Sequence, residues 1–361
     1  MAHQRSGDDV TAAKLDRLHA QLADAVADLV TGEDWTRALA FAARFRSRSF
    51  NNTLLIWMQH AAAFEQGRVS APTPTYVAGF RQWLRLGRSV DRGQPGYMIL
   101  APVVRRFASR TPQVAESWRM LAPREAPQRG EAVQSRLVGV RPAYVWDASQ
   151  TSGAPIPEEP RPRLLEGEAP PGMWDGLATL VRARGYSLRL VDSDRDLGGA
   201  NGMTDYLTRS VAVRGDIDPA ARVKTLAHEL AHVELHGPDH PEASLHRGIG
   251  EVEAESVALM IGAAHGLDTS SYTIPYVATW ATSVEGKTPV EVVQATGERV
   301  RSTAVAILSQ LHTAQVGAGD PPGLSRQSAQ GRPWERSLDA SPHTGSHRRH
   351  VARSTTAGPV L

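Results

Sequence analysis

An uninterrupted helix-forming stretch carries an H-E-x-x-H pentamer that begins at His228 and ends at His232. Residues 220–236 contain neither proline nor glycine, and the preceding Asp218 and Pro219 suit the N-cap and the first position of a helix. Residues four apart on a helix lie on one face, about one turn from each other. The pattern therefore predicts that the two imidazoles bind one metal ion.

A second helical stretch offers the third protein ligand that a zinc site needs. It begins nineteen residues after His232, at Glu251, and carries two further carboxylates, Glu253 and Glu255. Glu251 and Glu255 are four apart and share a helix face, whereas Glu253 points away from both. We predict that Glu251 is the third ligand and that Glu255 orients a ligating imidazole through its other ring nitrogen.

Two histidines and one carboxylate leave one position of zinc (Zn2+) open for water, which is typical of a catalytic site. Bound zinc lowers the pKa of that water to about 7, and Glu229 would take its proton and pass it to the leaving amine. The pattern thus predicts a zinc metallopeptidase that acts on a protein substrate. The alternative that the pentamer is a chance match stays open, because H-E-x-x-H is expected by chance in on the order of a few chains per hundred.

The composition is that of a soluble globular protein, with 22% charged and 41% hydrophobic residues. No apolar run approaches the roughly 18 residues of a membrane span, and no apolar stretch follows the first charges as in a secretory signal. We therefore expect a cytoplasmic protein with no membrane partner. The chain has no cysteine, so only histidines and carboxylates remain as strong metal ligands.

The 361 residues are enough for two domains, and the predicted fold class is α+β. A small basic α+β domain is expected at residues 1–146, and a domain around the H-E-x-x-H helix at 173–315. Six prolines mark residues 147–172 as an extended linker. Residues 316–361 have few large apolar side chains and are predicted to be disordered.

Hydrophobic periodicity predicts the secondary structure within these domains, apart from a poorly patterned insertion at 108–136. Helices are expected at 11–30, 35–45, 51–63, 76–83, 174–184, 219–236, 272–281 and 289–313. Strands are expected at 97–103, 138–146 and 187–191, with a hairpin at 203–206 and 210–213.

The charge is distributed unevenly along the chain. Between Arg44 and Arg110, eleven arginines and two acids give a net charge of +9, whereas residues 200–315 carry fourteen acids and eight bases. Ten aromatic residues are interleaved with these arginines, a pairing that can hold single-stranded nucleic acid, although most of the rings are expected in the core. The candidate nucleic-acid contacts are Arg48, Arg81, Arg85, Arg88, Arg92 and Trp83.

Other side chains near the pentamer have weaker signals. His236 lies one turn past His232 and is predicted to close the helix C-terminus, in preference to turning toward the metal. His240, His246 and Tyr272 are each candidates to donate a hydrogen bond to the oxyanion of a reacting amide. The sequence does not choose among these three.

Taken together, these segments resemble the ArdC-like antirestriction proteins over roughly residues 10–315. The resemblance rests on S-F-N-N-T-L-L-I at 49–56, V-A-G-F-R-Q-W at 77–83, L-G-R at 86–88, G-Q-P-G-Y-M-I-L-A-P at 93–102, T-L-A-H-E-L-A-H at 225–232 and E-V-E-A-E-S at 251–256.

The resemblance implies an N-terminal domain that binds single-stranded DNA, a C-terminal zincin-like metallopeptidase domain, and protection of DNA from restriction endonucleases during transfer of mobile elements. It implies zinc ligands at His228, His232 and Glu251 and a general base at Glu229. The chain is also similar to the ImmA/IrrE regulators, which implies a peptidase that acts on a repressor. A non-catalytic DNA-binding protein with a structural metal site is the remaining alternative.

Overall fold

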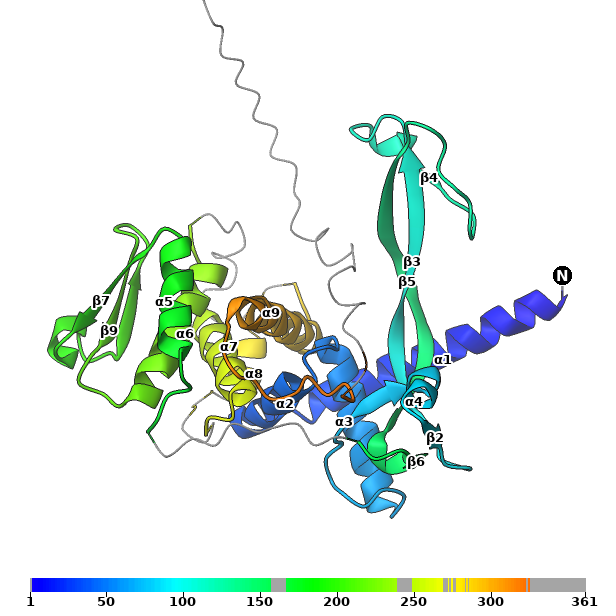
Figure 1. Cartoon of the computed structure of the whole chain (residues 1–361), viewed down its shortest axis with the longest axis horizontal. Helices are drawn as coiled ribbons and strands as arrows, with labels where there is room; N and C mark the ends of the chain where they lie inside the picture. The colour runs from blue at the N-terminus through cyan, green and yellow to red at the C-terminus, as the bar shows by residue number, and fades with distance from the viewer. Residues whose placement is uncertain are drawn as a thin grey trace, which may run out of the picture. The chain divides into compact units, whose positions relative to one another are not determined.

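The computed structural model describes residues 2–156, 167–238, 249–268, 272, 274, 277–282, 284, 286–322 and 324, apart from the side chains of residues 2–9, 194 and 278 (Figure 1). Met1–Ala101 and Arg141–Leu324 form one compact unit, and Pro102–Val140 belong to another. Helices and strands are mixed, as expected. No described helix is long and apolar enough to cross a membrane.

Three helices come first in the described chain, α1 (Ala2–Ala27), α2 (Gly32–Arg44) and α3 (Phe50–Glu65). The last two lie close to their predicted positions, whereas α1 starts nine residues before the predicted 11–30. A capping box starts α2: the Thr31 hydroxyl accepts from Asp34 N–H at 3.1 Å, and the Asp34 carboxylate accepts from Thr31 N–H at 2.9 Å. Ser49 caps α3 in the same sense, since its side chain accepts from the Asn52 backbone.

Two small sheets follow these helices. The first has the strand order β1-β5-β3-β4, and the second pairs β2 with β6. The bounds are β1 (Val77–Gly79), α4 (Phe80–Arg85), β2 (Arg88–Val90), β3 (Tyr97–Ser109), β4 (Arg119–Met120), β5 (Ala132–Asp147) and β6 (Thr151–Gly153).

Two sequence predictions need correction in this region. The helix expected at 76–83 begins only at Phe80, because Val77–Gly79 pair with the end of β5 as an antiparallel strand. The start of the predicted linker, 147–153, is regular structure: it completes β5 and forms β6, whose Thr151 lies opposite Val90. Residues 157–166 of the linker lie outside the described residues.

The unit Pro102–Val140 contains β4 and the larger parts of β3 and β5. It covers the poorly patterned insertion, and most of its residues in β5 are exposed or half-buried. A strand with no fully buried face has no reason to alternate apolar and polar residues, which explains the missing sequence signal. Arg119 forms ion pairs with Glu125 at 2.6 Å and Glu131 at 2.9 Å within this unit.

The second half of the chain builds a three-stranded sheet with the order β7-β9-β8. β9 pairs in parallel with β7 and antiparallel with β8, which confirms the predicted hairpin. α5 and α6 lie beside this sheet (Figure 1). The elements are α5 (Met173–Ala183), β7 (Ser187–Val191), β8 (Gly202–Asp205), β9 (Ser210–Arg214), α6 (Pro219–Leu235), α7 (Gly250–Ala264), α8 (Val277–Ala281) and α9 (Pro289–Gln310).

The helices of both halves of the chain share one hydrophobic core, which extends from Leu18 to Leu311. The indole N–H of Trp35 on α2 donates to the Ser256 hydroxyl on α7 at 2.9 Å. Each large side chain buried in such a core contributes about 1.5–3 kcal/mol. The two-domain division remains a prediction. Helices of both predicted domains contribute to this shared core, while α2 and α3 also form a second, smaller cluster with Val77, Tyr97 and Val145.

The start of the predicted tail is ordered. Val316 N–H donates to Ala264 O at 2.7 Å, and Gly319 O accepts from Val77 N–H at 2.9 Å. The prediction of disorder from residue 316 is therefore wrong for this short segment, because partners outside the tail satisfy its backbone polar groups. Residues 325–361 lie outside the described part of the chain, as do His240 and His246.

Candidate metal centre

α6 places one face in the core and the opposite face in a cleft. Asp218 caps the helix, since its carboxylate accepts from Ala221 N–H at 2.8 Å, and Pro219 follows as predicted. Leu226 and Leu230 are fully buried and fix the rotation of the helix. His228 and His232 consequently line the cleft.

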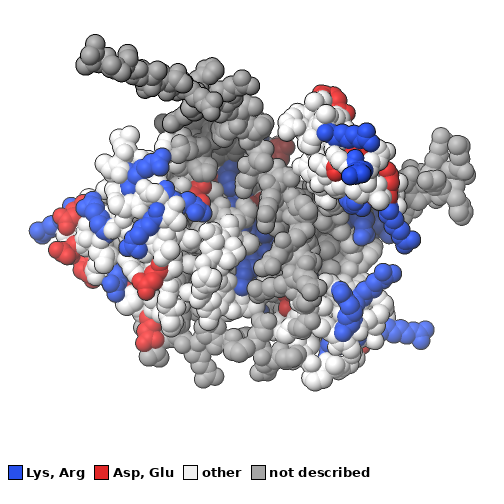
Figure 2. Space-filling model, turned by 45° about the horizontal axis from the view of Figure 1, so that its top comes forward, with Lys and Arg blue, Asp and Glu red and all other residues white. Residues whose placement is uncertain are grey.

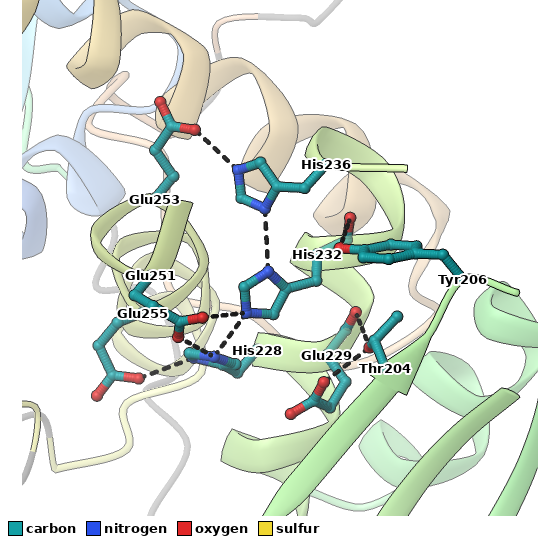
Figure 3. Close-up of polar contacts among 9 residues, drawn as sticks. All are labelled: Thr204, Tyr206, His228, Glu229, His232, His236, Glu251, Glu253 and Glu255. Atoms are coloured by element: carbon teal, nitrogen blue, oxygen red, sulfur yellow. Dashed lines mark hydrogen bonds and ion pairs between the residues drawn. The ribbon is translucent and has the colours of Figure 1, made fainter. Parts of the chain in front are cut away.

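Three side chains converge here as the helical-face argument predicted (Figure 3). The Nε2 atoms of His228 and His232 lie 3.0 Å apart, and the Glu251 carboxylate lies 3.4 Å from the first and 3.5 Å from the second. Two nitrogens bound tetrahedrally to one zinc at about 2.0–2.1 Å would be about 3.3 Å apart. The donor set and its spacing therefore fit a single tetrahedral divalent ion.

The electrostatics of the three groups are coupled. Hydrogen bonds from His228 and His232 hold the pKa of Glu251 well below its usual range. Burial lowers the pKa of His228, but contacts with Glu251 and Glu255 outweigh this and raise it to about 9. Glu255 Oε2 lies 3.1 Å from Nδ1 of His228, so it occupies the orienting position predicted for it.

Glu229 is buried, and its carboxylate is held by strand β8. The Thr204 hydroxyl donates to Glu229 Oε2 at 2.7 Å. Gly202 leaves room for this arrangement, since a Cβ there would lie 2.6 Å from Glu229 Oε1. Burial raises the pKa of Glu229, and the Thr204 hydrogen bond acts in the opposite direction. A carboxylate of raised pKa is suited to exchanging a proton near neutral pH.

Two tyrosines line the same cleft, and the hydroxyl of each donates to a backbone carbonyl. The Tyr272 hydroxyl donates to Ala258 O at 3.2 Å, so this one of the three candidate oxyanion donors is engaged with the backbone. The Tyr206 hydroxyl lies 3.3 Å from His232 O, and burial raises its pKa to about 12, which keeps the proton on the phenol. Sequence reasoning missed Thr204, Gly202 and Tyr206, because nothing in a short polar hairpin indicates which face meets a helix.

His236 ends α6, as predicted, with its backbone N–H donating to His232 O at 2.9 Å. Its ring, however, lies between two side chains. Nδ1 of His236 is 3.0 Å from Nδ1 of His232, and Nε2 is 2.9 Å from Glu253 Oε2. Glu253 thus points away from the three converging groups, in agreement with the helical-face argument.

The predicted nucleic-acid residues separate into two groups. Arg81, Arg85 and Arg92 are exposed, whereas Arg48 donates to Val77 O at 2.6 Å and Arg88 donates to the Thr151 hydroxyl at 2.9 Å. The latter two stabilise local structure.

Trp83 needs correction as a base-stacking candidate. Its side chain is 0% exposed, and its indole N–H donates to Trp146 O at 3.0 Å. The Trp83 ring is part of the core, where neither face can meet a base.

Other aromatic rings are exposed near α4. Phe80 and Tyr144 are 48% and 42% exposed, and their ring centroids lie 6.1 and 6.5 Å from that of Trp146. Lys14 Nζ lies 5.7 Å from the Tyr144 centroid. On the face drawn in Figure 2, acidic and basic side chains are mixed at the left, and basic ones predominate at the lower right.

Fold and site together define a mixed α and β protein with a His-His-Glu cluster suited to a divalent metal. Residues 8–146 match the family model described as the N-terminal domain of anti-restriction factor ArdC, so the chain is ArdC-like in this part. Comparison with curated proteins gives no match.

Two crystal structures of the antirestriction ArdC protein from the R388 plasmid are similar to the chain at 18% identity. The metal-free structure has a TM-score of 0.44 and the Mn(II)-bound structure 0.41. Each alignment covers 73% of this chain, with 84% of the first structure and 88% of the second.

Proposed function

We propose that the chain is a zinc-dependent peptide hydrolase of zincin-like architecture, with the metal held by His228, His232 and Glu251. The observation that carries this proposal is the spacing of the three donor groups, which suits one tetrahedral ion. Three protein ligands would leave a position for water on the ion, and the adjacent buried carboxylate of Glu229 would suit a catalytic role. The proposal includes a protein substrate, because a peptidase hydrolyses peptide bonds.

Zinc, when bound, would supply a Lewis acid and a water of lowered pKa. Residues of the protein itself would transfer the proton and bind the peptide. Glu229 would hold and pass the proton at Oε1 or Oε2, in a position fixed by Thr204. Strand β8 lies at the edge of its sheet, where unpaired backbone groups can bind an extended peptide.

The test is the isosteric change Glu229→Gln, assayed on a mixture of unstructured peptides by mass spectrometry and for zinc content by elemental analysis. We expect hydrolysis to be abolished and zinc retained, whereas His228→Ala should lose the metal. Glu234→Gln is a matched control, since Glu234 lies on the same helix and pairs with Arg184 at 2.8 Å, away from the cleft. Wild-type hydrolysis by Glu229→Gln would refute the catalytic assignment.

We also propose that the ArdC-type N-terminal domain binds single-stranded DNA, and that the protein protects DNA from restriction during transfer of mobile elements. The exposed rings of Phe80 and Tyr144, with Arg81 and Arg85 on the same short helix as Phe80, support this second function. Aromatic rings stack on unpaired bases, while arginines contact phosphates.

Fluorescence anisotropy with single-stranded oligonucleotides at two salt concentrations tests this second proposal. Phe80→Ala should weaken binding about fivefold or more, because a stacked base contributes about 1–3 kcal/mol. The double change Arg81→Ala, Arg85→Ala should also flatten the salt dependence. Leu84→Ala is the control, since Leu84 is 49% exposed on the same helix and carries neither ring nor charge. Equal effects of all three changes would count against the proposal.

A further inference from the structure

A series of part-buried polar contacts leads from His232 through His236 to Glu253 on α7 (Figure 3) and on to Arg299 on α9. The Nδ1 atoms of His232 and His236 are 3.0 Å apart, and His236 Nε2 is 2.9 Å from Glu253 Oε2. The other carboxylate oxygen, Oε1, accepts from Nε of Arg299 at 2.8 Å and also from its Nη2. Glu253 has a side chain only 1% exposed, so this carboxylate is removed from water and fully hydrogen-bonded.

The donor and acceptor of each hydrogen bond in this series follow from the proposed binding of a metal by Nε2 of His232. Nε2 of His232 faces His228 and Glu251, and an imidazole nitrogen that binds a metal must present its lone pair. The proton of His232 is then on Nδ1, and only the unprotonated Nδ1 of His236 can accept it. The proton of His236 is consequently on Nε2, where it is donated to Glu253.

The two histidines of the cluster are thus supported in different ways. His228 contacts the Glu255 carboxylate directly, through Nδ1 at 3.1 Å. His232 reaches a carboxylate only through the ring of His236. We propose that His236 and Glu253 are positioning residues, which fix the tautomer and ring orientation of His232 for metal binding, with Arg299 holding Glu253 in place. This inference rests on the proposed metal site.

A purely structural role for Glu253 would not require this arrangement. Arg299 compensates the charge of the buried carboxylate and occupies Oε1, whereas Oε2 is directed at His236. Contacts behind a metal ligand typically raise metal affinity 10–100-fold. The geometry therefore predicts a loss of zinc affinity when a substitution at His236 interrupts this series of hydrogen bonds, even though His236 is not one of the proposed ligands.

The experiment measures zinc affinity of the full chain by competition with a chromophoric chelator. His236→Leu should weaken zinc binding about tenfold or more. His236→Gln should restore most of it, because a glutamine amide can accept from His232 with its oxygen and donate to Glu253 with its nitrogen. Glu253→Gln should give an intermediate loss and shift the absorption spectrum of the cobalt-substituted protein, which reports ligand geometry.

His60→Gln controls for the loss of a buried imidazole. His60 is 0% exposed and bonded to Tyr97 and to the backbone, without contact to the cluster. Unchanged zinc affinity in folded His236→Leu and Glu253→Gln would overturn the inference, as would equal losses in His236→Leu and His236→Gln. If His236→Leu fails to fold, Glu253→Gln and His236→Gln decide. Failure of the wild type to bind zinc would instead refute the underlying metal site, and the inference with it.

Discussion

The hydroxyl of Thr204 on β8 donates a 2.7 Å hydrogen bond to the buried carboxylate of Glu229 on α6. This bond stabilises the ionised form of Glu229, whose pKa burial raises. Thr204→Val removes the donor and keeps the shape, so the pKa of Glu229 should rise further. We expect the acidic limb of the pH profile of kcat/KM for peptide hydrolysis to move to higher pH.

Thr179→Val is the control for this change, since Thr179 on α5 is exposed and donates to Asp175 O in its own helix. An unaltered acidic limb in Thr204→Val would mean that Glu229 does not limit hydrolysis as a base.

Gly202 is predicted to be indispensable for the position of Glu229. An added Cβ would lie 2.6 Å from both Glu229 Oε1 and Thr225 Cγ2, which is closer than atoms can approach without displacement. Gly202→Ala should therefore abolish hydrolysis while zinc content stays at the wild-type level. Gly215→Ala is the matched control, because the nearest atom to its added Cβ is 3.5 Å away. Full activity of Gly202→Ala would show that the carboxylate tolerates displacement.

The convergence of His228, His232 and Glu251 was predictable because it depends on helix geometry. A fixed rise and turn place His228 and His232 on one face, and the same rule separates Glu251 from Glu253. The role of the His236 ring was not predictable, since it depends on how α7 packs against α6. Thr204 was missed for the same reason: the contact joins a strand and a helix whose relative position no local pattern encodes.

The N-terminal part was harder to predict for a different reason. An aromatic residue flanked by arginines has the same sequence signature whether it is buried, as Trp83 is, or exposed, as Phe80 is. The packing between the two predicted domains could not be predicted for a similar reason. Apolar periodicity shows that α2 has a buried face, but not that this face packs on α7, where Trp35 bonds Ser256.

Gly297 on α9 is predicted to stabilise the fold through its small size. A Cβ at this position would lie 2.3 Å from the ring of Phe50 on α3. Glycine inside a helix ordinarily costs about 1 kcal/mol relative to alanine. Here the crowding should dominate, and Gly297→Ala should lower the free energy of unfolding by about 1–3 kcal/mol in urea titrations. Ser302→Ala, at an exposed position of the same helix, should be neutral or stabilising; a stabilised Gly297→Ala would contradict the close packing.

The metal-free protein should lose stability as the pH rises from neutral toward 9. In the folded state the pKa of His228 is about 9, above its ordinary value of 6.5, because the contacts with Glu251 and Glu255 outweigh burial. A group whose pKa folding raises stabilises the fold fully below its unfolded pKa, and this contribution disappears as the pH passes the folded pKa. The window of loss is therefore about 6.5 to 9.

Thermal unfolding between pH 6 and 9.5, with NMR titration of the imidazoles, measures this effect. Glu255→Gln removes one of the two contacts that raise the pKa, so His228 should titrate at lower pH, and the stability loss should be smaller and complete at lower pH. Glu291→Gln, at an exposed helix cap, should leave the His228 titration unchanged. Saturating zinc should remove the proton from His228 at pH 7.5, since the ion and the proton compete for Nε2. A His228 resonance that titrates near 6.5 in the metal-free wild type would contradict the coupling of this imidazole to the two carboxylates.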